Sequence, residues 1–328
     1  MPYQEDSSDN VMNEKEGEDE EDTLLFSCRC ESARAVSTLL SSLRHMGKSV
    51  SASNDTSADR SGLSGSKSQL CYVYVTGNGV TFHVHGLGRQ SQATADMQSG
   101  LFSDYYVSSE KILIDDENGG EPKEETITGG EFCVDLSTVL KCITVLGQAS
   151  LDKAKIAMSY DRETCIFRLE LEENGVISTC AILGSVADDN DENDGQSQMG
   201  LAVAFRRDKV VARAIVKSDY LKEAVSELVD MKNAGASFCT VGFGVDRIEM
   251  GAAGHSGECL VHLPKNPDIF VSLQCEPPNE HYARSYPLHS FLQGMRGLDI
   301  AHETCMTLNA KGMIAIQHQV LDTVSISS

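Results

Sequence analysis

Acidic side chains are the first candidates for chemistry in this sequence, because paired carboxylates can hold the metal ions of a nuclease. The densest group lies between residues 188 and 194, where five of the seven residues are Asp or Glu. We predict that this segment is a linker, so nothing would hold its carboxylates in place. Asp135 begins a predicted helix, where a carboxylate caps exposed N–H groups. We therefore predict a structural role for Asp135 and no catalytic residue in the chain.

Metal and phosphate motifs are equally weak. His255, Glu258 and nearby His262 do not form a zinc pattern, no C-x-x-C pair occurs, and the single-residue spacing of Cys28 and Cys30 is too short for a tetrahedral site. Residues 62–68 resemble a phosphate loop, but Ser66 separates the Gly from the Lys that this loop requires next to each other. We expect His83 and His85 to be packing or surface residues. The sequence predicts no metal site and no cofactor.

Length and composition exclude several classes of protein. The chain has 328 residues, 41% of them hydrophobic, which is enough for one large domain or two ordinary ones. It contains no apolar run long enough to cross a membrane as a helix, and its acidic start does not match a secretory signal. Its 11 cysteines fit free thiols in a reducing compartment, either the cytosol or the nucleus.

The net charge of −22 is concentrated in three short segments. Residues 1–22 carry ten acids and one Lys, residues 110–125 seven acids and two Lys, and residues 188–194 five acids and no base. Together they hold 19 of the 22 excess negative charges, so the rest of the chain is nearly neutral. We therefore divide the chain into an acidic disordered tail (1–22), a first domain (23–184), an acidic linker (185–200) and a second domain (201–328).

Four segments have the apolar periodicity of amphipathic helices. Two precede the linker and two follow it. They are 32–46, 135–146, 218–231 and 286–296.

Each predicted helix is followed by two strands joined by a tight turn. Asn78-Gly79 and Asn174-Gly175 are strong hairpin signals, and the third and fourth turns lie near Asp246 and Lys311-Gly312. A repeated unit of one helix and antiparallel strands predicts an α+β fold of two similar domains, each with two helices on an antiparallel sheet. After its second helix the first half shows three strands and the second half only two. The repeat therefore predicts that the second domain lacks its closing strand.

Apart from Asp135 at the start of the second, three of the four helices lack acidic residues, although the protein as a whole is strongly acidic. Residues 32–48, 136–148 and 286–298 contain no Asp or Glu. Bases mixed with small neutral residues suit the passage of a polyanion held by non-specific charge attraction. The third helix differs, because its Lys222 has four acidic neighbours. We predict that the DNA-facing bases are Arg34, Arg44, Lys48, Lys141, Lys222 and Arg296.

Several stretches resemble one known family. The most specific are GLFSDYYV and DLSTVLKCITVLG, and SARAVSTLLSSL, CIFRLELEENGVISTCAIL and SDYLKEAVSELVD also match. Together they resemble the Rad-one family, which supplies one subunit of the heterotrimeric DNA-damage checkpoint clamp called nine-one-one. This clamp belongs to the superfamily of sliding clamps that includes proliferating cell nuclear antigen.

The resemblance implies a DNA-clamp fold with helices lining a ring around duplex or junction DNA and sheets outside. It implies a non-enzymatic nuclear protein that works with two paralogous clamp subunits, is loaded by an ATP-dependent loader and supports checkpoint signalling and repair. A 3′–5′ DNA exonuclease and a homotrimeric replication processivity clamp are the alternatives. A ring closes by pairing sheet edges of neighbouring subunits. We expect these edges to include Val176, Ile177, Thr179, Ala181, Glu258, Leu260 and His262.

Overall fold

The computed structural model of the chain describes residues 23–44, 69–86, 90–114, 123–185, 200–277 and 280–320. Within these ranges, five α-helices and two short 3-10 helices accompany 19 strands. Every strand pair is antiparallel. The predicted α+β class and clamp-type fold are confirmed.

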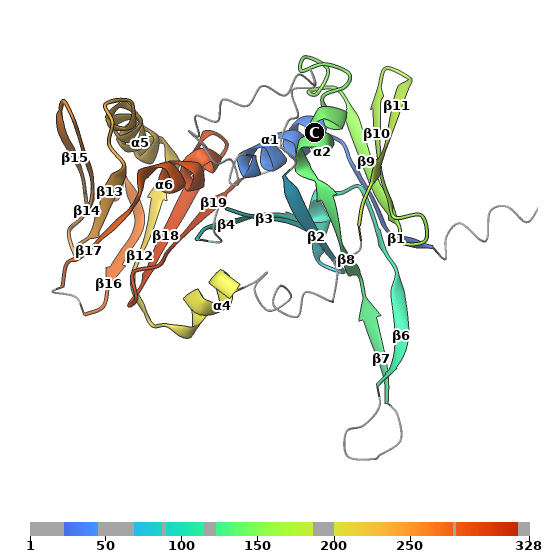
Figure 1. Cartoon of the computed structure of the whole chain (residues 1–328), viewed down its shortest axis with the longest axis horizontal. Coiled ribbons are helices and arrows are strands. Elements are labelled where there is room, and N and C mark those ends of the chain that lie inside the picture. The colour runs from blue at the N-terminus through green and yellow to red at the C-terminus, as the bar shows by residue number, and fades with distance from the viewer. Residues whose placement is uncertain are drawn as a thin grey trace, which may run out of the picture.

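The first half contains two sheets and a protruding hairpin (Figure 1). One sheet has the strand order β11-β10-β9-β1-β5, the other has the order β4-β3-β2-β8, and β6 and β7 pair only with each other. The elements are β1 (Leu24–Cys30), α1 (Ala33–Leu43), β2 (Leu70–Thr76), β3 (Gly79–His85), β4 (Gln92–Gln98), η2 (Ser99–Leu101), β5 (Asp104–Val107), β6 (Ser109–Ile114), β7 (Lys123–Thr128), β8 (Gly130–Asp135), α2 (Leu136–Ile143), β9 (Lys155–Asp161), β10 (Ile166–Glu173) and β11 (Val176–Leu183).

The second half repeats the two sheets with one strand fewer, and its described residues contain no counterpart of the β6–β7 hairpin. Its two sheets have the orders β16-β12-β18-β19 and β15-β14-β13-β17. The elements are α4 (Gly200–Arg207), β12 (Val210–Lys217), α5 (Ser218–Asn233), β13 (Phe238–Phe243), β14 (Arg247–Gly254), β15 (Gly257–Pro264), β16 (Phe270–Cys275), β17 (Tyr282–Pro287), α6 (Leu288–Gly294), η3 (Met295–Asp299), β18 (Glu303–Asn309) and β19 (Ile314–Gln319).

All four predicted hairpins are present, as β2–β3, β10–β11, β13–β14 and β18–β19. At the β10–β11 turn, Asn174 and Gly175 have φ values of 51° and 81°. A two-residue turn with both φ values positive has the twist that suits a hairpin, and Asn followed by Gly adopts it most easily. The Asn-Gly pair therefore predicted this hairpin because its two residues adopt the backbone angles that the turn requires.

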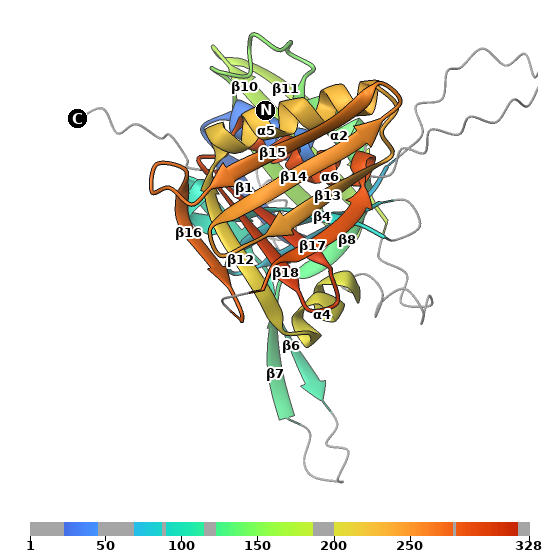
Figure 2. The same ribbon diagram turned by 90° about the vertical axis from the view of Figure 1, so that its left-hand side faces the viewer.

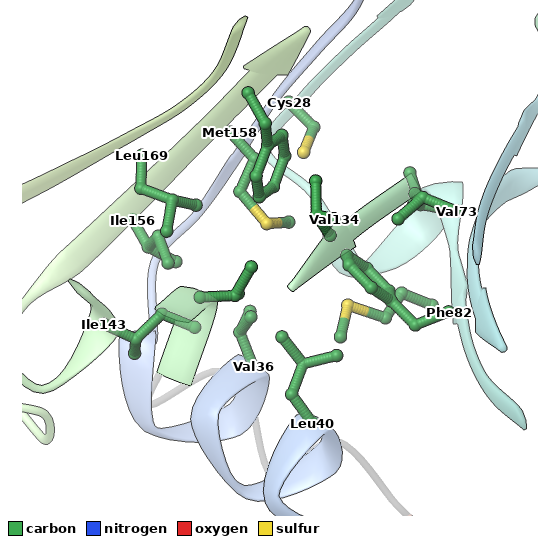
Figure 3. Close-up of a cluster of buried hydrophobic side chains, with 14 of the residues drawn as sticks. Cys28, Val36, Leu40, Val73, Phe82, Val134, Ile143, Ile156, Met158 and Leu169 are labelled. Atoms are coloured by element: carbon green, nitrogen blue, oxygen red, sulfur yellow. The ribbon is translucent and has the colours of Figure 1, made fainter. Parts of the chain in front are cut away.

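The core of the first half lies between its two sheets and its two helices. Figure 3 shows Val36 and Leu40 of α1 pointing toward Phe82 of one sheet, with Met158 and Leu169 of the other sheet nearby. All five side chains are at most 1% exposed. Burial of this apolar surface, at roughly 25 cal/mol per Å², is the main force that holds helices and sheets together.

The second half has a core of its own, built in the same way. Leu221 and Leu228 of α5 and Leu288 of α6 are completely buried against Val241 of β13 and Met306 of β18. The apolar periodicity that predicted the helices therefore marks the faces that the helices bury.

Side-chain caps set the starts of two helices. The Ser32 hydroxyl accepts a hydrogen bond from the Ala35 N–H, and the Asp135 carboxylate accepts from Ser137 and Thr138, so α1 and α2 begin one residue later than predicted. α6 also begins later, because Pro287 precedes it instead of lying in its first turn. The chain beyond Gly294 tightens into the 3-10 helix η3.

The sequence reading missed a strand before each of the four helices, namely β1, β8, β12 and β17, and it missed the short helix α4. The predicted tail (1–22) and most of the predicted linker (185–200) lie outside the described residues. Among the described residues of the second half, no strand follows β19.

Candidate nucleic-acid interface and subunit edges

The helices of the two halves form one continuous layer, which we call the helix row. α1 contacts α2 in the first half, η3 contacts α5 and α6 in the second, and α1 contacts η3 across the two halves. Figure 1 shows α5, α6, α1 and α2 along one side of the molecule. The prediction of DNA-facing Arg and Lys residues therefore requires that their side chains lie exposed on the helix row.

A cluster of positive groups lies where the two halves meet. Arg296 of η3 donates from Nη1 to the backbone oxygen of Arg44 at 2.8 Å, and both side chains are exposed. Lys232, at the end of α5, lies with its Nζ 3.5 Å from Nδ1 of His289 on α6. Burial, and then the charges of Lys232 and Arg296, lower the pKa of His289. The lowered pKa therefore reflects burial first, and the two neighbouring positive charges second.

Lys232 is a base that the sequence reading missed. It belongs to the acidic third helix, and its neighbour His289 is 57 residues away in the chain, so no local pattern connects the two. Within the described parts of the chain, Lys232 forms no ion pair. Its charge therefore adds to the positive groups where the two halves meet.

Arg34 is already engaged within the chain. Its guanidinium pairs with both carboxylate oxygens of Asp152, through Nε and through Nη2, and Nη2 also donates to the backbone oxygen of Gln148 at 3.2 Å. The two charged side chains are 46% and 58% exposed. Such a surface pair is weak in water and can open when a stronger anion approaches.

The other predicted bases differ in their surroundings. Lys141 is exposed on α2, within the last turn. Lys222 pairs with Asp219 at 3.0 Å on α5, as its acidic neighbours suggested. Lys48 lies outside the described residues.

Some of the neutral polar residues on these helices lie inside the protein. Ser37, Ser137 and Gln293 are each at least 90% buried. Small polar residues fit between a helix and its neighbours when they bond locally, which the period alone does not reveal. The exposed charge of the helix row therefore depends on the Arg and Lys side chains.

Asp135, which was considered for nuclease chemistry, and Asp161 both accept hydrogen bonds from backbone and hydroxyl groups. Asp135 accepts from Gln69 N–H at 2.8 Å and from the Thr138 hydroxyl at 2.6 Å. Burial would raise its pKa, but the hydrogen bonds from Thr138, Gln69 and Ser137 outweigh burial and lower the pKa. Asp161 accepts from Thr164 N–H and the Thr23 hydroxyl. Capping is the role that this geometry explains.

Two strands at opposite ends of the molecule are open sheet edges. β11 ends the five-stranded sheet of the first half, and β15 ends a sheet of the second half. Figure 1 shows them on the two far sides of the chain. Each has eight residues, and Val176, Ile177 and Leu260 are 60% exposed or more. The other predicted edge residues, Thr179, Ala181, Glu258 and His262, are exposed as well.

His262 belongs to a charged cluster on the outer sheet of the second half. Its Nδ1 lies 3.4 Å from Oε1 of Glu249, and Nε2 of His281 lies 3.2 Å from Oε2 of the same carboxylate. A hydrogen bond from Arg247, at 2.6 Å, is the main reason why the pKa of Glu249 is lowered. Figure 2 shows the sheet that carries these residues, with β15 along its edge beside α5.

The other residues considered for chemistry are explained by packing. His83 is 3% exposed and packs edge-on against Tyr72 and Tyr74, as predicted. None of the cysteines forms a disulfide. Among the described residues, no group of three or more His, Cys, Asp or Glu side chains is arranged to hold a metal ion, and no helix is long and apolar enough to cross a membrane.

Comparison with protein families gives a match over most of the chain. A family model described as "Repair protein Rad1/Rec1/Rad17" matches residues 26–320, which is most of the chain. The search of curated proteins found no match.

Proposed function

Because the chain belongs to the Rad1/Rec1/Rad17 family of repair proteins, which are checkpoint-clamp proteins, we propose that it is a non-enzymatic subunit of a heterotrimeric DNA sliding clamp. In this proposal it joins two paralogous subunits in the nucleus, an ATP-dependent loader places the ring on duplex or junction DNA, and the ring supports checkpoint signalling and repair. The observation that carries the proposal is the pair of open, uncovered edges at opposite ends of one molecule.

The two edges favour a ring over a simple dimer. β11 and β15 belong to different sheets and have different sequences, so joining one molecule's β11 to the next molecule's β15 is a head-to-tail contact. Head-to-tail contacts close into a ring when the rotation between subunits fits. Pairing would also cover apolar side chains such as Ile177 and Leu260, which are 65% and 60% exposed in the single chain. Open edges of this kind promote aggregation unless they are covered.

The helix row supports DNA as the ligand inside the ring. Its central cluster joins Arg44, Arg296 and Lys232, and Lys141 lies further along the row. These Arg and Lys side chains contact phosphates without recognising nucleobases. Each contact is weak, because a clamp must slide along the DNA. The remaining positive charge is small, so binding depends on the ring enclosing the duplex.

The proposal excludes catalysis. An exonuclease needs carboxylates free to hold metal ions, whereas Asp135 and Asp161 accept hydrogen bonds from the chain itself. No observation among the described residues favours the exonuclease alternative.

Charge reversal on the helix row tests the proposal. In the assembled trimer, Arg44→Glu, Lys141→Glu and Lys232→Glu together should weaken association with closed-circular duplex DNA equally for all sequences, and should flatten its salt dependence. The matched control is Arg29→Glu, Arg168→Glu and Arg213→Glu, which makes the same change in net charge at exposed positions on the outer faces of β1, β10 and β12.

We expect the helix-row variant to lose roughly ten-fold or more in affinity at low salt, because several phosphate contacts are lost together. The sheet-face control should lose much less. Equal losses of DNA affinity in both variants would show that net charge alone matters. Unchanged DNA affinity of the helix-row variant would show that this face does not contact DNA. Native mass spectrometry of each variant checks that the trimer still forms.

A further inference from the structure

Two cysteines of the first half lie next to each other, although they are far apart in the sequence. Cys142 is in the last turn of α2, and Cys180 is in the middle of β11. Their side chains interact directly, through a weak hydrogen bond between the two thiols. All the cysteines of the chain are free thiols in the structure, so this pair is reduced.

The packing of α2 on the sheet explains why the two thiols meet. α2 contacts both β10 and β11, with Cα atoms that approach within 8 Å. Figure 3 shows Ile143 of α2 on the same side of the core as Ile156 and Leu169. Leu169 is directly opposite Cys180 in the β10–β11 ladder, so these two side chains lie on one face of the sheet. The end of α2 therefore brings Cys142 to the face that carries Cys180.

Access to solvent distinguishes this pair from another close pair, Cys28 and Cys30 on β1. Cys28 and Cys30 belong to the interior of the first core and are each 3% exposed. Cys142 and Cys180 pack against the same core but are only partly buried. A small oxidant can therefore reach Cys142 and Cys180 while the first half remains folded.

We propose that Cys142 and Cys180 form a reversible intramolecular disulfide when the chain meets hydrogen peroxide. One thiol loses its proton and attacks an oxygen of the peroxide, so the O–O bond breaks and the sulfur becomes a sulfenic acid. The hydroxide that leaves takes up this proton and becomes water. The second thiol then attacks the sulfenic sulfur, which forms the S–S bond and releases a second water. A dithiol reductant restores both thiols by exchange.

The position of Cys142 determines how easily the bond forms. A disulfide needs Cα atoms roughly 4.4–6.8 Å apart, and Cys142 lies one residue before the end of α2, where a helix adjusts most easily. Burial raises the pKa of Cys142 to about 11, so its reactive thiolate is scarce near pH 7. The pair therefore oxidises slowly, and only when peroxide persists.

The disulfide ties the helix row to an edge strand. α2 belongs to the helix row, and β11 is the last strand of the five-stranded sheet. The bond closes a loop that contains β9 and β10, and such a cross-link opposes the local opening of the elements it joins. The inference rests on the contact between the two thiols and is independent of the clamp function.

Mass spectrometry of the purified full chain tests this proposal. The chain is treated with hydrogen peroxide, its remaining thiols are blocked with N-ethylmaleimide in acidic denaturant, and its peptides are compared with and without reduction. We expect the linked peptides that contain Cys142 and Cys180 to be the main disulfide product. Hydrogen exchange in β11 should slow roughly tenfold or more after oxidation and recover with dithiothreitol, whereas exchange in β15 should not change.

Three substitutions locate the bond. Cys142→Ser and Cys180→Ser each remove one of the two sulfurs, so peroxide should no longer slow hydrogen exchange in β11. Cys165→Ser is the matched control, because Cys165 is also partly buried against the first core, and this variant should respond to peroxide as the unaltered chain does. Thermal unfolding of the three variants without peroxide checks that the first half remains folded.

Two results would overturn the proposal. The first is that the disulfide between Cys142 and Cys180 does not form, or forms no more often than other cysteine pairs, with hydrogen peroxide and also with diamide, which oxidises neighbouring thiols directly to disulfides. The second is that peroxide still slows exchange in β11 of a folded Cys142→Ser or Cys180→Ser variant, because a different modification would then be responsible.

Discussion

At the scale of single residues, the hydrogen bonds of a carboxylate distinguish a structural role from a catalytic one. Asp135 caps α2 with both oxygens, and its position before an apolar-periodic segment was enough to predict this role. The partner of Arg34 could not be predicted in the same way, because Asp152 is 118 residues away in the chain. Sequence patterns reach across one helical turn, whereas ion pairs depend on the tertiary fold.

The cap at Asp135 gives a prediction for stability. Asp135→Ala should lower the free energy of unfolding by about 1 kcal/mol, because the N–H groups of Ser137 and Thr138 lose their acceptor. Asp135→Asn is the matched control, since an amide oxygen still caps the helix without a charge. Urea unfolding at pH 7 measures both variants.

The pH dependence of the same cap has a definite sign. The pKa of Asp135 is lowered from its ordinary value of 3.8, so the carboxylate stabilises the fold above that value and loses this contribution as the pH falls further. The wild-type chain should therefore lose more stability than Asp135→Asn between pH 5 and about pH 3. Identical acid profiles would show that the charge of Asp135 is unimportant.

The Arg34–Asp152 pair gives a prediction for DNA binding. Asp152→Asn should strengthen DNA association of the assembled trimer by roughly twofold to fivefold at low salt, because it releases Arg34 for a phosphate. In the Arg34→Gln background the same substitution should gain less. An equal gain in both backgrounds would show that Asp152 acts only through its own charge and that Arg34 does not contact DNA.

At the scale of elements, short-range signals predicted the hairpins and helices well. Asn174-Gly175 fixed a turn, and the apolar period located α1, α2, α5 and α6 to within a few residues. The strands before the helices were missed because a short apolar strand next to a helix breaks neither period clearly. β1 (Leu24–Cys30) and β12 (Val210–Lys217) are both of this kind.

The open edges give a prediction at this scale. Thr179→Pro in β11 and Leu260→Pro in β15 should each reduce assembly with paralogous subunits, because Pro cannot donate to a shared ladder. Val271→Pro is the control, since β16 is also an open edge but has no part in the proposed ring. Size-exclusion chromatography measures assembly, and circular dichroism checks folding.

The three Pro variants together distinguish the proposed edges from other edges. Loss of assembly for the β11 and β15 variants, with normal assembly for the β16 variant, supports the edge assignment. Normal assembly of the folded β11 and β15 variants would place the subunit contacts elsewhere.

At the scale of the whole molecule, one chain presents helices on one face and open edges at both ends (Figure 1). The repeat predicted two similar halves, and the two separate hydrophobic cores agree with it. How such chains join could not be predicted from periodicity, because an edge strand and an interior strand have the same alternation of side chains. The resemblance to a clamp family supplied that step, and the exposed edges at both ends support it.

The composition of the assembled ring tests the central claim most directly. The chain should be co-expressed with two paralogous clamp subunits and examined by native mass spectrometry. The account predicts one dominant complex with a 1:1:1 ratio of the three chains, because we propose that this chain, as a member of the Rad1/Rec1/Rad17 family, joins two paralogous subunits. A stable trimer of this chain alone, or a monomer that binds neither paralogue, would contradict it.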